Sequence, residues 1–82
     1  MYRSRPRLPS ELDGLLLDDL KAVIVQANLG ETDTLIAQKY LIGQIPQIDI
    51  ADMIGMHRTT VSKRIKYIVE RARQTAIKLN LS

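Results

Sequence analysis

The chain has 82 residues, enough for one small domain and too few for most enzymes. Hydrophobic residues make up 45% of it and charged residues 26%, a balance that is typical of a folded domain and too apolar for a disordered one. The sequence has no cysteine and one histidine, which excludes a disulfide framework, a thiol nucleophile and a cysteine-based zinc site.

The net charge of +3 conceals a segregation of charge along the sequence. Residues 1–7 carry three arginines and no acidic residue, and residues 57–82 carry seven basic residues against Glu70 alone. The stretch between them, residues 8–56, has two lysines and eight acidic residues. A basic third on a small domain is typical of a protein that binds a polyanion, although a solvated helix face gives the same charge run.

The first residues predict an extended arm. Pro6 and Pro9 restrict the backbone, and three arginines leave little to bury. We expect residues 1–9 to form a flexible basic arm and residues 10–82 to form the folded domain. The arm lacks the apolar segment of a secretory leader, and no apolar run approaches the ~20 residues of a membrane span. A cytoplasmic protein without membrane contact is therefore expected.

The first helix is expected to start at Ser10, where Ser10 and Asp13 form a capping pair. Apolar residues then recur with helical spacing as far as Ala27, where an asparagine and a glycine supply a stop signal. Gly14 weakens the first turn, so a shorter helix capped by Asp18 is the alternative.

Two short helices are expected next. The first opens at Glu31 or Thr32 and ends at Gly43. The second helix is expected to start at Pro46, because the N–H that proline lacks would have no partner in a first turn. Gly55 ends that helix.

The last helix is expected to run without interruption from near Arg58 to about Leu79. One side bears Val61, Ile65 and Ile68 and predicts a buried stripe. The opposite side carries mostly small, polar or basic residues: Thr59, Ser62, Lys63, Lys66 and Glu70. The sequence therefore predicts an all-α fold of about four helices, the last of which presents a face that fits the major groove of DNA.

Residues 46–66 join two of these helices in the pattern of a helix-turn-helix. Ala51 is small where the second helix crosses the first, and Gly55 supplies the positive φ that a sharp turn needs. Ile54 and Val61 are among the apolar residues that fix the angle between the two helices. We expect this unit to bind DNA through a long C-terminal recognition helix.

Several runs within residues 31–73 carry a resemblance to a known family. They are Lys39-Tyr40-Leu41, Asp49-Ile50-Ala51, Ile54-Gly55 and Thr60-Val61-Ser62-Lys63-Arg64-Ile65. Together they resemble region 4 of bacterial sigma factors, and small phage and plasmid regulators share the same unit. The resemblance implies binding to promoter DNA and docking on RNA polymerase. His57 stands where that family has a serine cap, and 82 residues leave no room for a promoter-melting region, so a complete sigma factor is not expected.

Nine residues are candidates for contact with DNA: Gln47, His57, Arg58, Thr59, Thr60, Ser62, Lys63, Lys66 and Tyr67. Arg58 is suited to a guanine, a contact worth ~1–3 kcal/mol of discrimination when bidentate. Lys66 and Gln47 are suited to the phosphate backbone. His57 either contacts a phosphate when protonated or caps the helix, and Tyr67 either contacts a phosphate or packs at the edge of the domain.

Two further features have more than one interpretation. Arg64 lies near the buried stripe, where an ion pair with Asp49 or Asp52 competes with a DNA contact. The stripe continues to Leu79, and it either packs against the first helix or forms a two-fold dimer interface.

We therefore expect a transcriptional regulator of the phage or mobile-element type, associated with the nucleoid, that binds double-stranded DNA as a homodimer. The alternative is an interaction module that docks on RNA polymerase or on another replication or packaging protein. The sequence contains no catalytic or metal-ligating constellation, so neither enzymatic activity nor a cofactor is expected.

Overall fold

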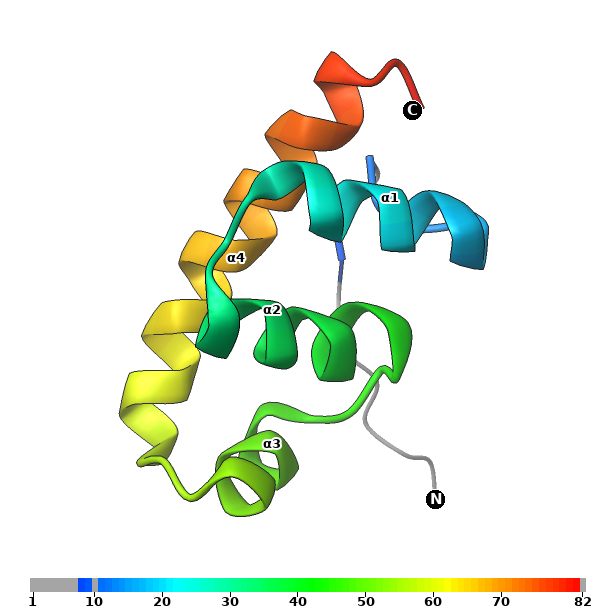
Figure 1. The fold of residues 1–82 in the computed structure, drawn as a ribbon. Helices are drawn as coiled ribbons and strands as arrows, with labels where there is room; N and C mark the ends of the chain where they lie inside the picture. The colour runs from blue at the N-terminus through cyan, green and yellow to red at the C-terminus, as the bar shows by residue number, and fades with distance from the viewer. Residues whose placement is uncertain (1–7, 10, 82) are drawn as a thin grey trace, which may run out of the picture.

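A computed structural model describes residues 8, 9 and 11–81 of the chain. The described residues form helices and turns and no strand, which confirms the predicted all-α class. The elements are α1 (Leu17–Ala27), α2 (Glu31–Ala37), the π-helical turn η1 (Gln38–Ile42), α3 (Gln47–Ile54) and α4 (Arg58–Lys78) (Figure 1). Residues 1–7 of the expected basic arm and the expected cap Ser10 lie outside the described residues. Within the described part, no helix has the length and apolar character needed to cross a bilayer.

Helix α1 is shorter than the helix expected from Ser10 and lies close to the shorter alternative. Residues 11–14 form a turn, and the helix begins only at Leu17. Gly14 has a φ of +91°, which is incompatible with an α-helix and ends the expected first turn. Leu12 is buried all the same and packs in the core. Asp18 lies in the first turn of α1 rather than at its cap, where its charge still suits the helix dipole.

Helix α2 continues into η1, whose π-helical geometry the sequence did not predict. The amide of Gly43 donates to the carbonyl of Gln38 at 3.0 Å, and the amide of Ile45 donates to the carbonyl of Lys39 at 3.1 Å. A Cβ atom on Gly43 would lie 2.8 Å from the Lys39 carbonyl oxygen. Glycine is therefore required at this close approach, which ends η1 and leads the chain toward α3.

Three residues connect α3 to α4. Pro46 caps α3 immediately before its first helical residue, and Gly55 ends the helix with a φ of +71°. The amides of Gly55 and Met56 both donate to the carbonyl of Ala51, which makes the turn sharp. The structure confirms the predicted ends of α3 and the predicted course of α4, which reaches Lys78.

Helix α4 is the element against which the other helices pack. Helix α3 lies near its start, α2 near its middle and α1 near its C-terminal half (Figure 1). The predicted stripe is at most 3% exposed and consists of Val61, Ile65, Ile68, Ala72 and Ala76. Beyond Ile68 this stripe is covered within the chain, where Arg71 Nη2 donates to the carbonyl of Ala27 at the end of α1 at 2.7 Å. The intramolecular interpretation of the stripe therefore holds as far as Ala76, whereas Leu79 is 37% exposed.

Arg64 ties α4 to α2. Its Nε donates to Asp33 Oδ1 at 2.9 Å and its Nη2 to Asp33 Oδ2 at 2.7 Å. Asp33 is 2% exposed, and its hydrogen bonds raise the pKa of the Arg64 guanidinium. The structure confirms the intramolecular ion pair of Arg64 but not its predicted partner. Arg64 pairs with Asp33 of α2, whereas Asp49 and Asp52 of α3 are exposed. This bidentate pair joins α4 to α2.

Candidate nucleic-acid interface

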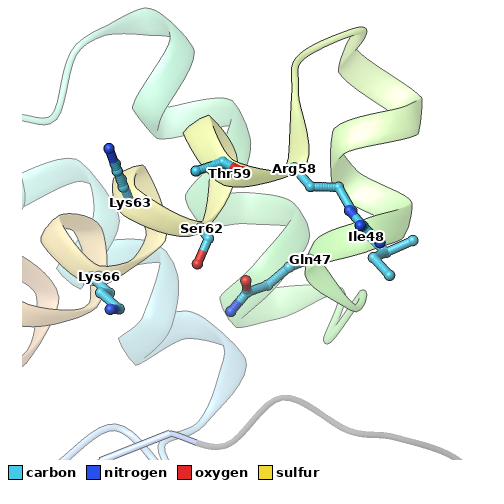
Figure 2. A pocket seen from close by; sticks show the side chains of 7 residues that line it. All are labelled: Gln47, Ile48, Arg58, Thr59, Ser62, Lys63 and Lys66. Carbon is cyan, nitrogen blue, oxygen red and sulfur yellow. The ribbon is translucent and has the colours of Figure 1, made fainter.

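The starts of α3 and α4 border an open hollow of about 360 Å³ on the surface (Figure 2). Its lining residues are Gln47 and Ile48 from α3 and Arg58, Thr59, Ser62, Lys63 and Lys66 from α4. The structure thus brings together six of the nine residues that the sequence predicted for contact with DNA. They meet because the three-residue turn places the start of α4 beside the start of α3.

The face of α4 at the hollow follows from helical periodicity. Residues 59, 62, 63 and 66 are spaced so that they share one side of the helix. Val61 and Ile65 lie on the other side and are buried, at 0% and 3% exposure. Because these two anchors fix the helix against the core, Lys63 and Lys66 are exposed.

Gln47 reaches the hollow from the first turn of α3. Figure 2 shows its side-chain amide directed into the same space as the hydroxyl of Ser62, with Lys66 beside them. Both Gln47 and Ser62 are partly buried, which limits the conformations open to them. Amides, hydroxyls and helix N-termini are donors for phosphate oxygens and base edges, so these two residues can orient an anionic ligand.

The charge of the hollow is of one sign. Arg58, Lys63 and Lys66 are basic, and none of the lining residues is acidic. The ion pairs among the described residues involve other side chains: Arg64 with Asp33, and Arg73 with Glu11 and Glu70. In the described part of the chain the three cations of the hollow therefore have no carboxylate partner and are available for phosphate groups. That part also has no group of three or more His, Cys, Asp or Glu side chains placed to hold a metal ion.

His57 occupies the N-cap of α4. Its Nδ1 accepts a hydrogen bond from the amide of Thr59 at 3.1 Å. Of the two roles predicted for His57, this is the capping role. A protonated Nδ1 cannot accept this bond, so a phosphate contact through that atom would come at the expense of the cap.

Thr60 and Tyr67 are exposed but are not among the residues that line the hollow. Thr60 is one residue beyond Thr59, which turns it about 100° around the helix. Tyr67 is 52% exposed and lies close enough to Arg64 to contribute to its raised pKa. These two residues flank the hollow rather than form it.

Ile48 is the lining residue that the sequence analysis missed. It is 50% exposed although it is a large aliphatic residue. A signal was present, because Ile48 precedes the buried Ile50 by two positions, or about 200° around α3. Helical periodicity alone therefore directs Ile48 away from the core.

Comparison of the chain with protein-family models, with curated proteins and with solved structures found no match. The resemblance to region 4 of sigma factors consequently depends on the sequence runs quoted above.

Proposed function

We propose that the protein binds double-stranded DNA sequence-specifically and regulates transcription, with α3 and α4 acting as a helix-turn-helix. The observation that carries this proposal is the hollow, in which three cations that pair with no carboxylate of the described residues share one face with hydroxyl and amide groups. Phosphate neutralisation supplies much of the affinity of such complexes, and hydroxyl and amide groups fix the register on the duplex.

In this proposal the start of α4 lies in the major groove. The groove is about 12 Å wide and an α-helix with its side chains is about 10–12 Å across, so one helix fits. Arg58 and Thr59 stand in the first turn of α4, the part of a recognition helix that meets base edges. Arg58 carries the donors for the O6 and N7 atoms of a guanine.

The remaining lining residues position the helix. Lys66 lies two turns beyond Arg58 and contacts a phosphate where the duplex backbone passes the helix. Lys63 lies between the two residues and can reach either a base edge or a phosphate. Gln47 meets the backbone on the α3 side of the groove. The protein thereby contacts the duplex from two helices whose relative orientation is fixed.

The rigidity of the unit supports the proposal. A recognition helix transmits sequence preference only if its rotation and tilt are defined. Here the Gly55 turn sets the angle to α3, the His57 cap orders the first turn and the Arg64–Asp33 pair holds the next turn against α2.

We further propose that the protein acts as a homodimer. One helix-turn-helix contacts few base pairs, and a two-fold dimer pairs half-sites about one turn of DNA apart. Because the stripe of α4 is used inside the chain, the contact falls on the outer side of α1. Leu17 and Val25 are 51% and 71% exposed there.

The test is a selection of duplexes from a random pool, followed by fluorescence anisotropy on the selected site. Reversing two charges of the hollow, with Lys63→Glu and Lys66→Glu together, is expected to abolish enrichment and to make the slope of log affinity against log salt shallower by about 1.8 for each bound protomer. The matched control reverses Lys21 and Lys39, which lie outside the hollow and change the net charge equally.

Three results would contradict the proposal: no enrichment of any sequence by the unmodified protein, equal losses for the two double variants, or no loss for either. Binding of RNA polymerase by a protein that enriches no duplex would favour the alternative of an interaction module.

A further inference from the structure

Ile48 is the one aliphatic side chain among the residues that line the hollow. Its side chain is half exposed, and the other lining residues are polar or basic. A single exposed apolar residue is ordinary on a protein surface, but this one lies within a surface otherwise built for an anionic ligand. At this position Ile48 would be complemented by an apolar group on the ligand.

Duplex DNA presents such a group in the major groove. The edges of the bases offer donors, acceptors and one apolar substituent, the C5-methyl group of thymine. We infer, on the basis of the proposed DNA-binding function, that Ile48 contacts the C5-methyl group of a thymine and gives the protein a preference for that base at one position. Ile48 is thus a specificity-determining residue contributed by α3 rather than by the recognition helix.

The position of this thymine follows from the neighbouring residue. Figure 2 shows the Arg58 side chain extending from the start of α4 toward Ile48. A guanidinium that reads a guanine therefore lies beside the isoleucine. We expect the thymine to be next to the guanine that Arg58 reads, on either strand.

The experiment replaces the thymines of the selected site one at a time with deoxyuridine, which removes only the methyl group. For the unmodified protein we expect one replacement, adjacent to the base pair read by Arg58, to weaken binding about fourfold, as the loss of one buried methyl group predicts. The remaining replacements should change the affinity little.

The variant Ile48→Ala should bind the thymine and deoxyuridine duplexes equally at that position. Because Ile48 is half exposed, this variant should unfold at the same temperature as the unmodified protein. The matched control is Met53→Ala, which truncates another half-exposed apolar residue of α3 outside the hollow. This control should keep the fourfold preference.

Two results would overturn the inference and leave the proposed function standing. The first is a selected site in which no thymine methyl group matters. The second is an Ile48→Ala variant that still prefers thymine to deoxyuridine at that position. This includes a variant that binds every duplex more weakly by the same factor, as the loss of a contact with deoxyribose would produce. Failure to enrich any duplex would instead defeat the proposed function itself.

Discussion

The first turn of α4 depends on a histidine where serine, threonine, asparagine or aspartate is commonly found. His57 satisfies the amide of Thr59 through an imidazole nitrogen, next to the residue that we place on a base edge. The first turn of α4 is therefore ordered by the hydrogen bond of His57, which forms without any contact with DNA.

We predict that His57→Ala lowers the free energy of unfolding by about 1 kcal/mol, the usual cost of a lost N-cap. His57→Ser should restore most of that loss, because a hydroxyl can accept the same hydrogen bond. Urea denaturation of the three proteins measures the difference. Equal destabilisation by the two substitutions would show that the histidine does not stabilise the protein as a cap.

Two residues of the hollow should respond differently to truncation. Arg58→Ala is expected to remove ~1–3 kcal/mol of discrimination at one base pair and little elsewhere. Lys66→Ala should weaken binding to every duplex by a similar factor and make the salt slope shallower by about 0.9 for each bound protomer. Affinities for a panel of single-base variants of the selected site separate the two patterns. If neither substitution affects binding, our orientation of α4 on the duplex is wrong.

Among the elements, α3 and α4 were predictable because their signals are local. Pro46 and Gly55 mark the ends of α3 in the sequence, and the apolar period of α4 identifies its buried side over the whole helix. The period of α4 also located the polar face that lines the hollow. These features depend on the residues of the helices themselves and little on the rest of the fold.

The missed features depend on tertiary structure. The late start of α1 is an exception, because Gly14 was already recognised as a weak point of the first turn and takes a positive φ in the structure. The π-helical geometry of η1 requires the backbone at Gly43 to approach the Lys39 carbonyl closely. The hydrophobic periodicity of the sequence does not indicate this contact. The partner of Arg64 was missed because Asp33 is 31 residues away in the sequence and reaches it only when α2 packs on α4.

The Arg64–Asp33 pair should control both stability and binding. We predict that Asp33→Asn lowers the unfolding temperature and weakens DNA binding, because the neutral amide cannot replace a carboxylate buried against a guanidinium. The control is Glu70→Gln, which removes a carboxylate from an exposed pair with Arg73 on α4 and should have a smaller effect. Thermal unfolding and anisotropy provide the comparison. An Asp33→Asn protein as stable as the control would contradict the role of this pair.

At the scale of the whole molecule, the basic hollow and the exposed apolar residues of α1 lie in different parts of the fold. The basic hollow lies at the start of α4, whereas α1 packs near the C-terminal half of that helix and exposes Leu17 and Val25. In our proposal one surface binds DNA and another binds a second copy of the chain.

We predict that size-exclusion chromatography with light scattering gives twice the mass of the chain, and that Val25→Glu gives a folded monomer whose unfolding temperature no longer depends on protein concentration. Gln26→Glu introduces the same charge at the neighbouring exposed position and should leave the dimer intact. A monomeric unmodified protein, or dissociation by both substitutions, would argue against a contact through this side of α1.

The most direct test of DNA binding is the affinity of the unmodified protein for a duplex as a function of salt. With about five phosphate contacts, the slope of log affinity against log salt should be about −4.5. Fluorescence anisotropy between about 50 and about 200 mM salt covers the useful range. A slope near this value is the predicted result. An affinity that does not change with salt would contradict the proposed DNA binding, because the three cations of the hollow would then not contact phosphates.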